Sequence, residues 1–150
     1  MKLVIMTTLC TAVLYAGCRS QKLRADKVPS VVVNTFQARF PAITGVDWKK
    51  IVNGYEAEAD INDSTEVSVR FDETGKLLVT KQDVSNKEIN ATIMATIQQD
   101  YKDYEVDDVE KLETNGNVYY QVELKAKRKK EVNLVFTVEG REEKTVAYWD

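Results

Sequence analysis

Hydrophobic side chains recur at helical spacing in two separate stretches of the chain. In the first stretch, Val32, Phe36 and Phe40 lie four residues apart and therefore on one side of a helix. Pro29 is well placed for the first turn of that helix, and Pro41 ends it. The pattern predicts one helix between the two prolines.

The second stretch begins at residues 85–88 with Ser-Asn-Lys-Glu, the form of a capping box. Hydrophobic residues then recur every four positions, at Ile89, Ile93, Ile97 and Tyr101. A second helix is therefore predicted in the second half of the chain.

The segments after each helix alternate between hydrophobic and polar residues, as in strands with one buried face. Each half contains an Asn-Gly turn signal, at residues 53–54 and 115–116, because both positions of a two-residue hairpin turn need positive φ. The alternating hydrophobic positions that follow are Tyr55, Ala57, Ala59 and Ile61 in the first half, and Val118, Tyr120, Val122 and Leu124 in the second.

A second pair of alternating runs keeps the same order. One run ends at Phe71 before a polar turn at residues 72–76, and the other ends at Phe136 before a turn at residues 137–141. The two halves stay in phase from helix to last turn, which indicates a tandem repeat.

The repeat predicts an α+β fold in which a helix followed by four antiparallel strands occurs twice. Residues 28–84 form the first unit and residues 85–150 the second, within a single domain. A unit of about 60 residues buries too little surface to be stable alone. We therefore expect one continuous sheet with both helices on one face and the other face open.

The composition of the 150-residue chain narrows the range of functions. The formal net charge is −3, so no overall positive field attracts nucleic acid. The chain has no histidine, which excludes histidine-based triads and the common zinc sites. No serine lies in a nucleophile motif, and with 24 acidic residues a chance pair of carboxylates is expected. We predict a protein that is not an enzyme and binds no metal or cofactor.

Residues 1–17 have the features of a signal peptide. Lys2 supplies a positive start, and the apolar run Leu3–Ala16 is too short to span a bilayer. The run ends in Leu-Tyr-Ala-Gly-Cys at residues 14–18, which resembles a bacterial lipobox and implies lipidation of Cys18. Tyr15 stands where leucine is usual, so cleavage by the ordinary signal peptidase is the alternative.

The polar residues 18–27 are predicted to form a flexible tether between membrane and fold. Residues 19–22, directly after Cys18, lack the acidic residues that resemble inner-membrane retention or surface-export signals. We expect an outer-membrane lipoprotein on the periplasmic side of the cell envelope, in contact with the membrane only through its anchor at Cys18. Without lipidation, the protein is expected to be secreted to the periplasm.

Three segments of the first unit carry a family resemblance. They are Phe-Pro-Ala-Ile-Thr-Gly-Val-Asp-Trp at residues 40–48, Asn-Gly-Tyr at 53–55 and Phe-Asp-Glu-Thr-Gly-Lys at 71–76. Together they resemble the PepSY-like family of secreted bacterial proteins. The similarity extends from Val28 to Val146.

The second unit resembles this family less closely. Tyr101-Lys102 replaces Phe-Pro, Val109 replaces the tryptophan, and Thr137 replaces the aspartate. The family is similar in fold to beta-lactamase inhibitor protein, in which two tandem units form one curved sheet whose open face can clamp another protein. The resemblance implies no catalytic residues, and it supports inhibition of a peptidase or hydrolase by analogy of fold alone.

Five positive charges fall within six residues between two predicted strands of the second unit. They are Lys125, Lys127, Arg128, Lys129 and Lys130. Such a cluster can bind an acidic partner or anionic lipid. The alternative, which the pattern favours, is a soluble hairpin tip whose lysines discourage aggregation.

Glu56, Glu58 and Asp60 point to one side of a predicted strand, and Asp63 is close in sequence. Residues 60–66 have oxygen donors at alternate positions, as at the start of a calcium loop, but they lack its glycine and its terminal bidentate glutamate. A solvated strand face opposite lysine or arginine of the next strand is the favoured interpretation.

Trp48 and Tyr119 are the aromatic candidates for partner binding, because large aromatic residues dominate binding hot spots. For Trp48 the favoured alternative is packing between helix and sheet. Tyr119 falls on the polar phase of its strand, and both interpretations stay open.

Two functions compete. The leading hypothesis is a noncatalytic exported binding module whose open sheet face captures a protein or peptide of the cell envelope, as an inhibitor or sensor. The alternative is a structural or stress-related envelope protein that binds ions or small anionic ligands through the acidic strand or the basic cluster.

Overall fold

The computed structural model describes residues 21–150. The predicted signal peptide and the lipidation site at Cys18 lie outside the described residues. The short strand β1 (Gln21–Leu23) and a turn of 3-10 helix, η1 (Ala25–Lys27), lie within the segment predicted as a tether. Residues 21–27 are thus part of the fold, because β1 pairs with the edge of the first unit.

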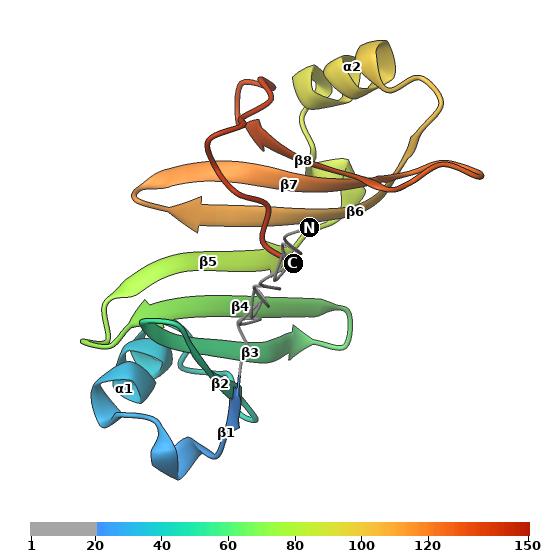
Figure 1. The fold of residues 1–150 in the computed structure, drawn as a ribbon. Helices are drawn as coiled ribbons and strands as arrows, with labels where there is room; N and C mark the ends of the chain where they lie inside the picture. Colours follow the sequence, from blue (N-terminus) through green and yellow to red (C-terminus); the bar gives the residue numbers. More distant parts are fainter. Residues whose placement is uncertain (1–20) are drawn as a thin grey trace, which may run out of the picture.

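One antiparallel sheet of eight strands runs through the described residues, in the spatial order β1 to β8. Each strand pairs with its neighbour in sequence, so the chain forms a meander. Figure 1 shows the first unit at one end of this sheet and the second unit at the other, with β5 of the first beside β6 of the second. The bounds of the strands are Gln21–Leu23 (β1), Asp47–Ile51 (β2), Gly54–Asn62 (β3), Thr65–Asp72 (β4), Leu77–Asp83 (β5), Glu105–Thr114 (β6), Asn117–Lys125 (β7) and Val132–Thr137 (β8).

The two predicted helices are α1 (Ser30–Arg39) and α2 (Ala91–Asp100). The capping box at Ser85 is present, but it opens a short 3-10 turn, η2 (Asn86–Glu88), rather than α2 itself. The α-helix begins later because the side chain of Asn90 accepts a hydrogen bond from the backbone N–H of Ile93 at 2.9 Å.

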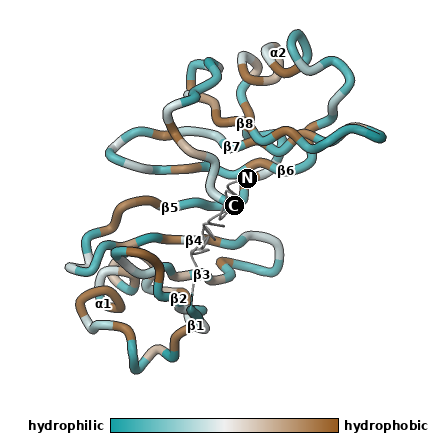
Figure 2. Tube along the Cα trace, viewed as in Figure 1, coloured by the Kyte–Doolittle hydropathy of each residue, from teal (hydrophilic) through white to brown (hydrophobic). Residues whose placement is uncertain are grey.

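Each helix covers its own hydrophobic cluster on the same face of the sheet. Under α1, Phe36 packs edge-on against Trp48, with ring centres 5.6 Å apart. Under α2, Ile93 and Ile97 pack against strands β6 to β8. Figure 2 shows apolar residues along the strands and helices, and polar residues at the tip of the β7–β8 hairpin.

The predicted α+β class, the tandem units and the continuous sheet with helices on one face are confirmed. The prediction of four strands in each unit is wrong for the second unit. After β8, Glu142 forms a single β-bridge with Phe136, and no strand follows in the described chain. The first unit's last strand, β5, has β4 and β6 on its two sides, whereas the equivalent segment of the second unit has only β8 as a neighbour.

The turns at the ends of the two units hold their helices in the same way. Gly75 and Gly140 both adopt positive φ, +85° and +83°. A Cβ atom at Gly75 would lie 2.9 Å from Val31 of α1, and one at Gly140 would lie 2.6 Å from Thr92 of α2. Glycine is required at both turns because each helix lies against the turn backbone.

We expect Gly75→Ala to lower the free energy of unfolding by more than Gly116→Ala. Gly116 also has positive φ, +76°, but nothing lies within 4 Å of its added Cβ atom. That variant carries only the left-handed backbone cost of about 1–2 kcal/mol, whereas Gly75→Ala must also displace α1. Urea denaturation of both variants measures the difference, and equal losses would contradict the close helix contact.

The turn after β4 also depends on the charge of Asp72. Its Oδ1 accepts hydrogen bonds from the hydroxyl of Thr74 at 2.6 Å and from the N–H of Lys76 at 3.0 Å. Chiefly through the Thr74 hydroxyl, these bonds hold the pKa of Asp72 below its ordinary value of 3.8.

Because the folded pKa is lowered, the carboxylate of Asp72 stabilises the fold above pH 3.8 and loses this effect as the pH falls through the folded value. We expect Asp72→Asn to be less stable than the wild type at pH 6. The gap should shrink at a pH below the folded pKa, where the wild-type side chain is neutral too. Urea unfolding at both pH values tests this, and a gap independent of pH would count against it.

Candidate functional site on the open face of the sheet

The sheet face opposite the helices carries the polar phase of the strands. Cross-strand partners share a face, and Ser68 of β4 pairs with Lys81 of β5, while Glu110 of β6 pairs with Gln121 of β7. All four side chains point away from α1 and α2. Despite the lack of a helix over them, Gln121 is fully buried and Glu110 is 8% exposed.

The C-terminal segment of the chain covers the middle of this face. The N–H of Glu143 donates to the carbonyl of Val135 at 2.7 Å, and the chain then leaves the sheet edge. In Figure 1 the segment runs from β8 back across the sheet and ends beside β5. The expected open face is therefore partly occupied by the protein's own chain.

Trp149 anchors this segment. Its backbone N–H donates to Oε1 of Gln121 at 3.0 Å. Its backbone carbonyl accepts from Nε2 of Gln121 and from Nζ of Lys81, both at 3.0 Å. The guanidinium of Arg70 lies 3.9 Å from the centre of the indole ring. We call Arg70, Lys81 and Gln121 the Trp149 cradle.

Two buried carboxylates hold the cradle in position. Glu56 accepts a hydrogen bond from Nε of Arg70 at 2.6 Å. Glu110 lies 2.6 Å from Nζ of Lys81 and accepts from Nε2 of Gln121 at 3.0 Å. A buried charge without a partner is strongly destabilising, so each of these pairs fixes both of its members.

Burial also perturbs the ionisation of two groups next to the cradle. It raises the pKa of Glu110, and the hydrogen bond from Lys81 opposes this rise without cancelling it. Burial raises the pKa of Tyr148 as well, and the negative charges of Glu110 and Glu123 add to the effect. Glu110 and Tyr148 are thus both shielded from solvent beside the cradle, Glu110 more fully than Tyr148.

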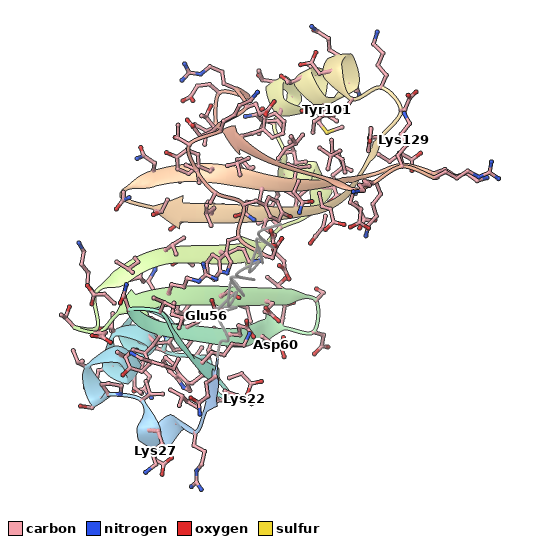
Figure 3. The ribbon with its side chains drawn as sticks, in the orientation of Figure 1. Lys22, Lys27, Glu56, Asp60, Tyr101 and Lys129 are labelled. Carbon is pink, nitrogen blue, oxygen red and sulfur yellow. The ribbon has the colours of Figure 1, made fainter. Side chains whose placement is uncertain are left out.

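Cations of the neighbouring strands pair with two of the three acidic residues of β3. Glu56 pairs with Arg70, and Lys49 of β2 lies 3.5 Å from Glu56 and also contacts Glu58. Asp60 is exposed at the far end of β3, and Figure 3 shows it on the same strand as Glu56. Within residues 21–150, no three acidic or other ligand side chains are grouped so as to hold a metal ion. Glu56 and Glu58 form the expected ion pairs with neighbouring strands, but Glu56 is buried and not solvated, and Asp60 lies opposite Glu66.

Trp48 is 3% exposed and packs between α1 and the sheet, where Phe36 and Phe71 flank it. As a partner-binding residue this candidate is wrong, because the helix covers the indole. Tyr119 is half-buried on the open face of β7, opposite Leu112 of β6 and Thr137 of β8. Its role in binding stays a prediction.

The basic cluster lies in and beside the β7–β8 hairpin. Lys125 is 2.6 Å from Asp107 and 2.9 Å from Glu123, and Lys129 is 2.6 Å from Asp103. In the part of the chain that the structure describes, the other three cations have no acidic partner within ion-pair distance and are exposed. They are Lys127, Arg128 and Lys130.

A groove of about 520 Å³ lies on the helix side where the two units meet. Arg39 of α1 and Glu113 of β6 line it and form an ion pair at 3.5 Å across the units. Most of its other lining residues are polar. The Arg39–Glu113 ion pair links the two units across this groove, and the groove was not predicted from the sequence.

The residues of the Trp149 cradle were missed by sequence reasoning. Lys81, Glu110 and Gln121 fall on the polar phase of their strands, which ordinarily indicates exposure to solvent. The one available signal was Trp149 itself, a large aromatic residue in a polar segment after the last predicted turn. Its position over the sheet depends on tertiary structure.

None of the helices within residues 21–150 is long and apolar enough to cross a membrane.

Comparison with known families identifies one match. The profile of the family described as "Putative beta-lactamase-inhibitor-like, PepSY-like" matches residues 14–79 and again residues 56–141. The two matches overlap at residues 56–79 and together cover most of both units. No curated protein matches the chain.

Solved structures of similar fold come from Bacteroides species. A DUF2874 family protein from Bacteroides ovatus has a TM-score of 0.69 at 22% identity, covering 79% of this chain and 86% of that one. A BLIP-like protein from Bacteroides fragilis has a TM-score of 0.64 at 21% identity, covering 76% and 82%. A protein from Bacteroides eggerthii, described as periplasmic, has a TM-score of 0.70 at 15% identity, covering 77% and 85%. These likenesses show the fold.

We expect Trp149→Ala to lower the free energy of unfolding by about 2 kcal/mol, the scale for exposing one large apolar side chain. Trp48→Ala is the matched control, and as a core substitution it should cost about 3–5 kcal/mol. Urea denaturation followed by circular dichroism measures both. If the two variants lost equal stability, Trp149 would belong to the core that holds the sheet together rather than to a segment docked on it.

Proposed function

Because the chain belongs to the PepSY-like, beta-lactamase-inhibitor-like family, we propose that it is a noncatalytic exported module that captures a protein or peptide of the cell envelope on the open face of its sheet. Inhibition or sensing of a hydrolase is the role that the fold analogy supports. The observation that best supports this proposal is a sheet face without a covering helix. Charged side chains on that face are held in place by buried partners.

Fixed charges on an open face favour binding for a physical reason. Arg70 and Lys49 are each held by a carboxylate from a neighbouring strand. A partner that contacts them need not immobilise flexible side chains, so less conformational entropy is lost on association. Charges of both signs on the same face also select for a partner with the complementary pattern.

Export to the periplasmic side of the envelope is part of the proposal. It is supported by the signal-peptide features of residues 1–17 and by the lipobox-like residues 14–18, with Cys18 as the lipid anchor. The similar structure from Bacteroides eggerthii is described as that of a periplasmic protein.

Binding of small anionic ligands at the hairpin tip is the second candidate function. Exposure of Lys127, Arg128 and Lys130 at the tip favours it, since no acidic side chain within residues 21–150 forms an ion pair with them. Lys127→Glu should then weaken anion binding, while protein capture on the sheet face persists.

A photo-crosslinking residue at position 60 tests the leading proposal. Asp60 is exposed on the open face of β3, so we expect a single envelope protein to be captured there. The matched control places the same residue at position 37, where Gln37 is exposed on α1 on the opposite side of the molecule. Mass spectrometry identifies the captured proteins.

Capture specific to position 60 supports the open face as the binding surface. Identical products at positions 60 and 37, or none at either, would overturn the proposal. A Tyr119→Ala variant in the position-60 chain then tests whether Tyr119 contributes to the same surface.

A further inference from the structure

We propose that the Trp149 cradle is a peptide-binding site, which takes an aromatic residue, tryptophan above all, from an extended segment of a partner protein. The C-terminal segment of this chain is the occupant that such a segment displaces. The inference deepens the proposed function, on which it rests, by naming the chemistry of the ligand.

The cradle binds the main chain of its occupant. Gln121 donates to the carbonyl of Trp149 and accepts from the N–H of the same residue, and Lys81 adds a second donor to that carbonyl. These contacts engage main-chain atoms that every residue except proline possesses. A segment of unrelated sequence can therefore form them, as in other recognition modes in which an extended peptide binds through its main chain.

The side-chain subsite selects an aromatic ring. Arg70 lies 3.9 Å from the centre of the indole, and Nζ of Lys81 lies 5.3 Å from it. Two cations near one ring favour the electron-rich face of tryptophan over tyrosine or phenylalanine, and they disfavour aliphatic side chains. Trp149 is buried to 7% exposure in this position, so the subsite fits a whole indole.

The cradle is held in place without the C-terminal segment. Glu56 orients Arg70, and Glu110 orients both Lys81 and Gln121. All of these contacts lie within the sheet, between strands β3 and β7. Release of Trp149 therefore leaves a preorganised site with an unpaired amide oxygen and a free ammonium donor.

The C-terminal segment is attached like a bound peptide. Its backbone pairs with the sheet at Glu143 and next at Trp149, and in the described chain residues 144–148 form no backbone hydrogen bond to the sheet between these points. A short link of this kind gives a local concentration of about millimolar. A partner segment with a stronger set of contacts can outcompete it.

The test uses the full chain and a peptide of its own sequence. A fluorescein-labelled peptide of residues 142–150 is titrated with the wild type and with Trp149→Ala, in which the internal occupant has lost its indole ring and keeps only its backbone contacts. We expect fluorescence polarisation to show binding to Trp149→Ala that is at least about tenfold tighter than to the wild type. The same peptide with alanine in place of tryptophan should not bind either chain.

A second pair of variants locates the site. Arg70→Ala added to Trp149→Ala should weaken peptide binding roughly tenfold, whereas Arg39→Ala, on the helix side, should leave it unchanged. Circular dichroism confirms that each variant is folded. The alanine peptide tests the need for the indole without any change to the protein, so its result does not depend on the protein's stability.

Equal binding of the peptide to wild type and Trp149→Ala, or no binding to either folded chain, overturns the inference. This assay needs no envelope partner, so its failure is distinct from failure of the crosslinking experiment. Capture at position 60 without peptide binding would leave the proposed function standing and remove the cradle as its peptide site.

Discussion

The pairing of β5 with β6 is the contact on which the rest of the structure depends. It joins residues 79–83 of the first unit to residues 110–114 of the second. Because side chains alternate with a period of two, this register also sets which face of each unit points which way. Both helices fall on one side, and the polar phases of both units form one surface. Lys81 of the first unit meets Glu110 of the second only through this join.

The two faces of the sheet bury different kinds of side chain. On the helix side, each unit buries its own hydrophobic cluster, centred on Phe36 under α1 and on Ile93 under α2. On the opposite side, burial involves charged and amide groups that are paired across strands, together with Leu112, Val135 and Trp149. Ion pairs of this kind add little net stability, but they fix side-chain positions. The surface is therefore suited to recognition more than to holding the fold together.

The second unit departs from the first where its last strand is missing. In the first unit, β5 follows the turn at residues 72–76 and is paired on both sides. In the second, the segment after residues 137–141 would be an edge strand with one neighbour. It forms a single bridge at Glu142 and then crosses the open face to Trp149. The last strand of the first unit thus joins the two units. The equivalent segment of the second unit instead covers part of the open face.

The sequence alone determined the elements and the repeat. Helical spacing at Val32 and Phe36, alternation along β3 and β7, and the turn at residues 115–116 depend on local backbone geometry, so they can be read from neighbouring residues. The predicted turn at residues 53–54 is wrong by one position, because the turn lies at residues 52–53 and Gly54 begins β3 without positive φ. The packing of Trp48 was also the favoured expectation. Only the tertiary structure decided that Gln121 and Glu110 are buried and that Trp149 lies over them. A polar residue on the outer phase of a strand looks solvated in sequence, and its burial depends on a segment far along the chain that crosses the sheet.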